Sequence, residues 1–333
     1  MKVCLYFEGE KLIRKSGIGR AFQHQKEALS LAGVEYTTDP NDEYDILHIN
    51  TIGPKSLSII ANARSLERKV IYHAHTTEED MRNSFMFSNQ VAPVMKQYIT
   101  KLYSRADMIL TPTPYSKSLL EGYGIDKPIY DVSNGINLKR FEYDEEKVKA
   151  FKTYFGLSAN KKVIISVGLY FERKGITDFM EVAKTLPQYT FIWFGFTPLR
   201  TIPRHVQEAI KNAPDNVILP GYVKGAVIEG AFRAADCFFF PSNEETEGIV
   251  VLEALAAHQQ VIVRDIGVYD PWLVDKVNCY KGNNNTEFSN LIVGVLEKSL
   301  NSTRDAGYKT AEEKSIANIG EKLKKAYQEV MDM

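Results

Sequence analysis

Two glutamates spaced eight residues apart, Glu245 and Glu253, form the clearest pattern for chemistry in this sequence. They follow an apolar run at 235–240 that is typical of a buried parallel strand, which Pro241 would end. From about Gly248 the apolar residues recur at helical spacing, so Glu245 should lie in a strand-to-helix loop and Glu253 inside the helix. A buried carboxylate needs a partner, and vicinal sugar hydroxyls would serve. The pattern therefore favours ligand binding at the carboxyl end of a strand, where open α/β sheets hold their ligands.

A pair of cations, Arg173 and Lys174, follows a predicted strand at 163–168 and precedes a predicted helix at 177–186. Two adjacent cations are unfavourable before the amino end of a helix unless an anion binds there. The segment therefore indicates an anion site.

A glycine-rich turn precedes the first predicted helix, which spans 20–32. Gly17, Gly19 and Arg20 lie where free N–H groups and the positive end of the helix dipole suit a phosphate. The glycine pair also begins the dinucleotide fingerprint, but Phe22 occupies the third glycine position and no clear acid follows a second strand. A phosphate contact is the interpretation we carry forward, with a turn that binds no ligand as the alternative.

A histidine ends the predicted strand at 70–77. His75 enters a polar loop there, and a histidine at a strand end can hydrogen-bond a sugar hydroxyl. We favour His75 over His73 because alternation along the strand and the distance to the loop bring His75 nearer the opening. A lone histidine is more often structural, so this assignment depends on the resemblance described below.

Two features are compatible with a lipid surface. The amphipathic helix predicted at 56–68 is basic, and the stretch at 81–87 is unusually apolar for a loop. The first is equally compatible with a solvated helix that covers a sheet, and the second with core packing. The residues concerned are Lys55, Arg64, Arg68 and Lys69, and then Phe85, Met86 and Phe87.

The bulk properties indicate a soluble, two-domain α/β protein. The chain has 333 residues, which is more than one compact core usually spans. Of these residues 44% are hydrophobic and 25% are charged, as is ordinary for a soluble globular protein. A net charge of -1 gives no reason to expect a nucleic acid partner. Three scattered cysteines without metal-type spacing fit a reducing cytoplasm. The amino terminus turns polar too early for a signal peptide, and no apolar run reaches the roughly 20 residues of a membrane span.

Short apolar runs alternate with helical patterns along both halves of the chain, which is typical of parallel sheets. The last predicted helix spans 315–331. The predicted strands are 3–7, 45–50, 70–77, 108–112 and 129–132 in the first half and 163–168, 191–196, 217–223, 235–240 and 261–263 in the second.

The motif Pro241-Ser242-x-x-Glu245, followed by Leu252-Glu253-Ala254, resembles the nucleotide-sugar motif of the retaining family-4 glycosyltransferases. The resemblance covers nearly the whole chain. It implies the GT-B fold, two Rossmann-like domains with doubly wound parallel sheets that face each other across a cleft. It also implies domains at 1–141 and 142–314 and a crossing helix at 315–333.

In that family the first glutamate faces the donor sugar and the second binds the ribose. The family pattern Gly-Arg-Leu followed by Lys-Gly holds the donor diphosphate. Gly168, Lys174 and Gly175 match it, but Leu169 stands where the arginine is expected. We expect Arg173 to supply that charge, because a guanidinium can bridge two phosphate oxygens while an ammonium acts as a point charge.

The resemblance further implies donor contacts from Gly17, Gly19 and Arg20 of the amino-terminal domain and a functional His75. It extends the donor site to the start of the motif helix, at Gly248, Ile249 and Val250. We expect no metal and no cofactor beyond the UDP-sugar co-substrate, since the sequence has no Asp-x-Asp pair. The leaving phosphate would itself take the acceptor proton, in a front-face attack with retention.

The segments at 72–80 and 245–253 are similar to bacterial enzymes that glycosylate diacylglycerol glycolipids, in particular those that make diglycosyl-diacylglycerol, the lipoteichoic acid anchor. The resemblance implies a UDP-hexose donor, a monoglycosyl-diacylglycerol acceptor and a peripheral position on the inner face of the cell membrane. Three alternatives remain open: a family-4 enzyme acting on a soluble or polysaccharide acceptor, a GT-B sugar-nucleotide epimerase, and an NAD-binding oxidoreductase. The sequence does not decide between UDP-glucose and UDP-galactose as the donor.

Overall fold

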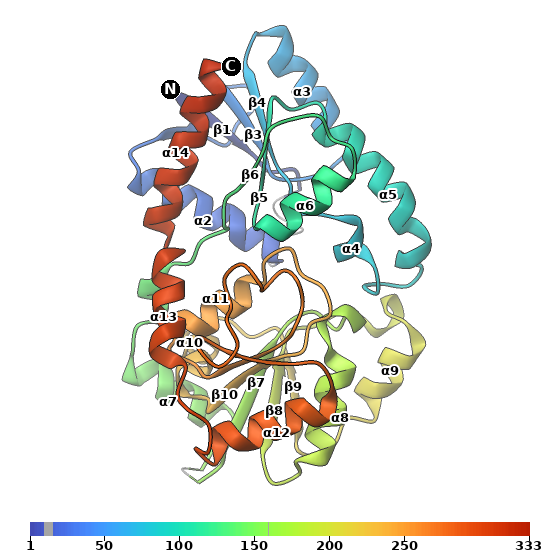
Figure 1. The fold of residues 1–333 in the computed structure, drawn as a ribbon, viewed down its shortest axis with the longest axis vertical. Helices are drawn as coiled ribbons and strands as arrows, with labels where there is room; N and C mark the ends of the chain where they lie inside the picture. Colours follow the sequence, from blue (N-terminus) through green and yellow to red (C-terminus); the bar gives the residue numbers. More distant parts are fainter. Residues whose placement is uncertain (10–15, 159) are drawn as a thin grey trace. The chain divides into compact units, whose positions relative to one another are not determined.

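The computed structural model describes residues 1–9, 16–158 and 160–333. The chain forms two compact units, one comprising Met1–Met81, Gln90–Asn137 and Lys314–Met333, and the other Arg82–Asn89 and Leu138–Glu313. Each unit contains one parallel six-stranded sheet, which confirms the predicted α/β class (Figure 1). The crossing helix predicted at the carboxyl terminus belongs to the first unit, and the apolar segment after His75 belongs to the second.

The first sheet has the strand order β2-β1-β3-β4-β5-β6. Val3 and Leu5 of β1 join the core on one face, while Cys4 and Tyr6 join the core on the other. Because both faces are buried, these strands are continuous apolar runs rather than alternating ones. The strands are β1 (Lys2–Tyr6), β2 (Glu35–Thr37), β3 (Ile46–Ile49), β4 (Lys69–His73), β5 (Met108–Thr111) and β6 (Ile129–Asp131).

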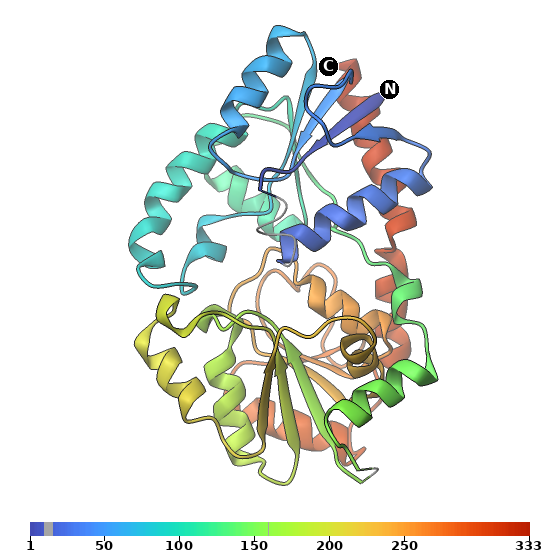
Figure 2. The ribbon, with the colours of Figure 1, turned by 180° about the vertical axis from the view of Figure 1, so that it is seen from behind.

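Helices cover both faces of this sheet. The α2 and α14 helices pack together on the face of Val3 and Leu5, and Figure 2 shows both from behind. Side chains of α3, α5 and α6 fill the opposite face. The helices are α2 (Gly17–Leu31), α3 (Ser56–Ser65), α4 (Glu78–Met81), α5 (Ser88–Tyr103), α6 (Pro114–Gly122) and α14 (Ile316–Asp332).

The second sheet has the strand order β12-β11-β10-β7-β8-β9. Its strands are β7 (Val163–Val167), β8 (Thr190–Phe194), β9 (Val217–Gly221), β10 (Cys237–Phe240), β11 (Val261–Arg264) and β12 (Tyr280–Gly282). Phe239 lies in the core under α8, α9 and α12, while Phe238 stacks on Phe232 of α10 on the opposite face. The helices of this unit are α7 (Glu145–Tyr154), α8 (Ile176–Thr185), α9 (Arg204–Lys211), α10 (Ala226–Ala234), α11 (Ile249–Ala256), α12 (Asn285–Leu296) and α13 (Arg304–Glu313), with 3-10 turns η1 (Leu138–Phe141), η2 (Glu172–Lys174) and η3 (Leu199–Thr201).

Each sheet has one point at which the strand order reverses. In the first it lies at β1 and β3, and in the second at β7 and β10. Open α/β sheets bind ligands outside the carboxyl ends of the strands at such a point. The loops that matter most are therefore those after β1 and β3 in the first unit and after β7 and β10 in the second.

Several elements differ from the sequence-based expectation. The strand predicted at 70–77 ends at His73, and the helix predicted at 56–68 ends at Ser65. The edge strands β2 and β12 were not predicted. Helix α5 was not predicted either, and it contains Pro93, which disfavours a helix interior.

All three cysteines are buried and free. Within residues 1–9, 16–158 and 160–333 we find no helix that is long and apolar enough to cross a membrane.

Candidate active site

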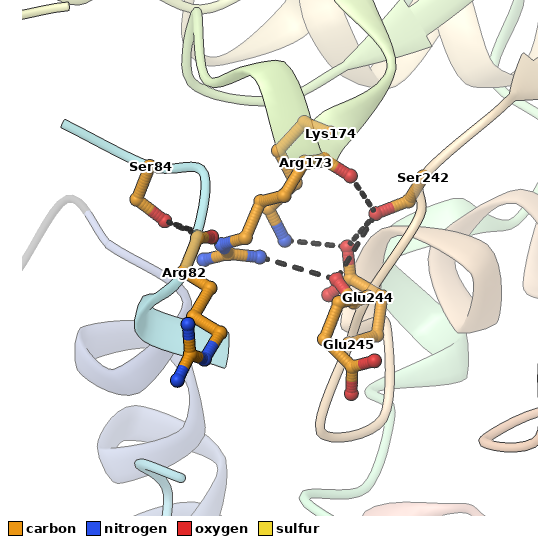
Figure 3. A network of polar contacts seen from close by, with 7 residues as sticks. All are labelled: Arg82, Ser84, Arg173, Lys174, Ser242, Glu244 and Glu245. Carbon is orange, nitrogen blue, oxygen red and sulfur yellow. Dashed lines mark hydrogen bonds and ion pairs between the residues drawn. The ribbon is translucent and has the colours of Figure 1, made fainter. Parts of the chain in front are cut away.

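Glu245 lies in the loop after β10, and its Oε1 atom accepts two hydrogen bonds. Ser242 Oγ donates at 2.7 Å, and Lys174 Nζ donates at 2.5 Å from η2 (Figure 3). Glu245 is 5% exposed, so its charge needs this cation. The sequence separates Lys174 and Glu245 by 71 positions, yet the reversal of strand order between β7 and β10 makes them neighbours.

The approach of η2 to this loop depends on Gly175. Its φ of +76° lies in the left-handed region, and a Cβ atom there would stand 2.2 Å from the carbonyl oxygen of Pro241. Glycine at this position therefore lets the two loops touch. The same residue precedes α8, whose amino end faces the loop region with its positive dipole end.

Arg173 is buried, with 8% of its surface exposed. Its Nε donates to Ser84 Oγ at 2.7 Å and its Nη1 donates to the Glu244 carbonyl at 3.2 Å (Figure 3). Its backbone N–H donates to the Asn83 carbonyl at 2.9 Å. The guanidinium thus ties the segment Arg82–Asn89 to the loop after β10. The sequence predicted a diphosphate contact for this side chain but gave no sign of these three contacts.

We expect Arg173→Ala to lower both the stability of the protein and kcat. Loss of charged hydrogen bonds at a buried site should reduce the free energy of unfolding by about 1.5–3 kcal/mol. Adding Leu169→Arg should restore kcat but not stability, because Leu169 is 40% exposed and an added charge there does not replace the hydrogen bond from Arg173 to Ser84. Urea unfolding and steady-state kinetics measure the two effects separately. An Arg173→Ala protein as stable and as active as wild type would contradict both roles.

Glu253 lies in α11 and is fully buried. Arg140 Nη1 is 3.8 Å from Glu253 Oε1, and Arg140 Nε donates to Glu229 at 2.8 Å. Burial raises the pKa of Glu229, but Arg140 and Lys147 together outweigh it and hold that pKa below its usual value. Two cations and two carboxylates therefore meet beside α11.

The remaining donor-side candidates lie in the loop after β7 and at the start of α11. Gly168 follows β7, and its carbonyl accepts a hydrogen bond from Trp193 Nε1 at 2.8 Å. Gly248 is the N-cap of α11, and Ile249 and Val250 form its first turn. The second unit thus brings together Gly168, Arg173, Lys174, Glu245, Gly248, Ile249, Val250 and Glu253 around β7 and β10.

His75 lies just beyond β4 in the first unit and is 6% exposed. Its Nε2 contacts Asn50 Oδ1 at 3.0 Å, and its ring stacks on His73 with centroids 4.3 Å apart. Burial lowers the pKa of His75 to about 3, so the ring is neutral. His73 lies deeper, where its Nδ1 contacts Gln25 Nε2 at 2.9 Å.

The glycine turn starts α2. Ser16 is the N-cap and accepts from Gly19 N at 3.3 Å, and the Arg20 backbone N–H donates to the Ser16 carbonyl. Helix α2 therefore begins at Gly17 rather than at Arg20. Gly17, Gly19, Arg20 and His75 belong to the first unit, whereas the donor-side set belongs to the second.

Two polar residues at strand ends were missed by the sequence analysis. Asn50 directly follows β3, and Arg264 ends β11, where its Nε donates to the Pro241 carbonyl at 3.2 Å and its Nη2 pairs with Asp178 at 2.8 Å. Both stand at the carboxyl end of a parallel strand, and that position was the signal that could have found them. Within the described ranges, no group of three or more His, Cys, Asp or Glu side chains is arranged to hold a metal ion.

Two doubly wound parallel sheets, with polar side chains gathered at strand ends, are the architecture expected for a glycosyltransferase of the GT-B fold. Residues 149–313 match the family described as Glycosyl transferases group 1, and residues 19–140 match Glycosyltransferase Family 4. A processive diacylglycerol alpha-glucosyltransferase of Acholeplasma laidlawii is 50% identical over 99% of this chain and 99% of its own length. The chain belongs to this glycosyltransferase family, as its nucleotide-sugar motif predicted.

More distant relatives agree. An alpha-galactosylglucosyldiacylglycerol synthase of Streptococcus pneumoniae is 30% identical over 68% of this chain and 62% of that protein. Among solved structures, Anabaena Alr3699/HepE in complex with UDP-glucose has a TM-score of 0.79 at 15% identity, covering 99% of this chain and 100% of its own. That likeness confirms the predicted GT-B fold.

Proposed function

We propose that this enzyme transfers glucose from UDP-glucose to a monoglycosyl-diacylglycerol and so makes a diglycosyl-diacylglycerol. The observation that carries the proposal is the 50% identity, over 99% of both chains, with a protein named as a diacylglycerol glucosyltransferase. That name also favours glucose over galactose, between which the sequence did not decide.

The donor site supports the chemistry of this transfer. Breaking the glycosidic bond builds charge on the leaving diphosphate, and Lys174, Arg173 and the amino end of α8 supply positive charge in place. Glu253 would bind the ribose hydroxyls, and Glu245 would face the donor hexose. We propose that transfer proceeds with retention and without a metal. The leaving phosphate would then accept the proton of the acceptor hydroxyl as the new bond forms.

A transfer assay tests the proposal. UDP-[14C]glucose should label glucosyl-diacylglycerol in mixed micelles, and soluble glucosides should be poor acceptors. Robust transfer to an oligosaccharide without lipid or detergent would overturn the lipid acceptor. Release of UDP without any acceptor would favour an epimerase-type reaction instead, and a change in NADH absorbance would favour an oxidoreductase.

We further propose that the enzyme attaches peripherally to the cytoplasmic face of the membrane. Phe85, Met86 and Phe87 are exposed by 38%, 39% and 67%, and a run of exposed apolar side chains is typical of an interaction surface. Phe87 also has a φ of +66°, an unfavourable conformation for a bulky residue that tends to occur at functional positions.

The basic helix α3 and its flanking residues offer fewer free cations for membrane attachment than the sequence suggests. Arg64 pairs with Asp107 at 2.7 Å, and the Arg68 guanidinium lies 3.9 Å from the centre of the Tyr44 ring. These two cations are therefore held within the fold. Lys55 is exposed and Lys69 is partly exposed, and these two are the better candidates for contact with anionic lipid.

We expect Phe87→Gly to weaken vesicle binding while leaving the protein at least as stable. Glycine adopts a positive φ without strain, and the strain of a bulky residue costs on the order of 1–3 kcal/mol. Flotation with vesicles of anionic and neutral phospholipid measures binding, and thermal unfolding measures stability. The matched control is Leu57→Gly, which removes another exposed apolar side chain, from α3. If Phe87→Gly binds vesicles as tightly as wild type, the apolar segment is not the attachment site.

A further inference from the structure

A cavity of about 180 Å³ lies in the first unit at the point where the order of its sheet reverses. Its walls come from the loops after β1, β3 and β4, together with α2 and α5. Since a cavity needs roughly 10–15 Å³ to admit one water molecule, this one has room for about a dozen water-sized groups, the size of a single pyranose ring. The lining residues are Glu8, Ile18, Asn50, Thr51, Ile52, Gly53, His75, Thr76 and Tyr103.

Asn50 has the most informative position in this wall. It is 2% exposed, and its Oδ1 atom contacts His75 Nε2 at 3.0 Å. Because a carbonyl oxygen only accepts, His75 must carry its hydrogen on Nε2, which leaves Nδ1 as a lone-pair acceptor. The amide of Asn50 therefore fixes the tautomer and the orientation of the histidine ring.

The other end of the same amide has no protein partner. Asn50 Nδ2 is buried and makes no hydrogen bond to any residue in the described part of the chain. A buried donor without an acceptor costs about 1–3 kcal/mol, so a bound hydroxyl oxygen would satisfy it favourably.

Glu8 supplies a hydrogen-bond acceptor. Its two carboxylate oxygens accept from the backbone N–H of Lys55 at 3.2 and 3.1 Å, which leaves further acceptor capacity on a carboxylate. A Cβ atom on Gly53 would stand 2.2 Å from the Glu8 carboxyl carbon, so glycine is what allows this approach. The cavity thus offers an acceptor at Glu8 and a donor at Asn50, with apolar wall from Ile18 and Ile52.

We propose that this cavity binds the hexose ring already present on a glycolipid acceptor, with Asn50 Nδ2 donating to one ring hydroxyl and Glu8 accepting from another. In the same arrangement Asn50 is the positioning residue of His75. The proposal rests on the proposed function, which it deepens by assigning the group that recognises the acceptor sugar.

A prediction about acceptor selectivity follows. Diacylglycerol itself has no hexose to place in the cavity, whereas glucosyl-diacylglycerol does. Loss of the Asn50 N–H donor or of the Glu8 charge should therefore affect transfer to glucosyl-diacylglycerol more than transfer to diacylglycerol.

Two Asn50 variants separate recognition from positioning. Asn50→Asp keeps an oxygen for His75 Nε2 and loses the N–H donor, so it should raise KM for glucosyl-diacylglycerol roughly five- to tenfold with little change in kcat. Asn50→Leu loses both functions and should also lower kcat for both acceptors. One monodeoxy analogue of glucosyl-diacylglycerol should lose affinity for wild type but show no further loss with Asn50→Asp.

Gln25→Leu is the matched control. Gln25 is another buried amide that contacts a histidine, but it lies behind His73 and does not line the cavity. It should change stability alone. Glu8→Gln provides a second test if Asn50 variants fold poorly, since it should raise KM for glucosyl-diacylglycerol and spare diacylglycerol.

Unchanged KM for glucosyl-diacylglycerol in both Asn50→Asp and Glu8→Gln would overturn the assignment, as would an equal rise in KM for both acceptors in these two variants. The proposed function fails separately, if wild type labels no lipid at all. In that case calorimetric titration with octyl α-glucoside still decides the present inference. Binding by wild type that is lost in Asn50→Leu supports the cavity as a hexose site, and binding that is equal in the two proteins, or absent from wild type, refutes it.

Discussion

Replacing Glu253 by glutamine should weaken UDP binding about 10- to 100-fold. The carboxylate is fully buried in α11, where it would accept two hydrogen bonds from the ribose hydroxyls. A hydrogen bond to a charged group contributes roughly 1.5–3 kcal/mol, which corresponds to this range. Glutamine retains the shape of the side chain and one acceptor oxygen, so the loss reports the charge. Calorimetric titration with UDP measures it directly.

Glu229→Gln is the control for this experiment. Glu229 shares Arg140 with Glu253 and also pairs with Lys147 at 3.0 Å, but it has no assigned contact with the nucleotide. If Arg140 were the actual determinant of affinity, both variants would weaken binding to a similar degree. Wild-type affinity in a folded Glu253→Gln protein would refute the ribose assignment.

Replacing Lys174 by methionine should reduce kcat by about 10²- to 10³-fold, the usual cost of removing one preorganised group that stabilises developing charge. The effect should be larger on kcat than on the Kd for UDP-glucose, because charge on the diphosphate grows as the bond breaks. Steady-state kinetics and titration with UDP-glucose compare the two quantities.

The same change should also destabilise the protein, because it leaves the buried Glu245 carboxylate without the Lys174 ammonium. The double variant Lys174→Met/Glu245→Gln removes both charges, so it should recover much of the stability and none of the activity (Figure 3). If the double variant recovers activity together with stability, Lys174 is a structural partner of Glu245 and has no role in transfer.

The sequence sufficed for most elements that carry the donor site. The apolar runs at 163–168 and 235–240 became β7 and β10, and the helical spacing after Gly248 became α11. These predictions succeeded because buried parallel strands and amphipathic helices leave a local periodicity that a few residues reveal. Pro93 in α5 and the short strands β2 and β12 left no such signal, and there local propensity was a poor guide.

The assignment of individual side chains was less complete. Arg173 was expected beside a diphosphate, and the fold also gives it Ser84 as a partner, a residue 89 positions away. Asn50 was seen only as the end of a strand, whereas the fold places its amide against His75, 25 positions away, and in the wall of a cavity. Neither pairing leaves a trace in local spacing.

The sequence by itself thus indicated the class of protein: the motif that holds Glu245 and Glu253, the Lys174-Gly175 pair and the alternation of strands and helices together resemble the family-4 glycosyltransferases of the GT-B fold. Only the tertiary structure decided which side chains share a site, and that the segment Arg82–Asn89 joins the second unit rather than the first. The physical reason is that neighbouring parallel strands bring the loops at their carboxyl ends together, so that loops far apart in the chain become neighbours. Hydrogen bonds between them depend on that topology rather than on the sequence around each residue.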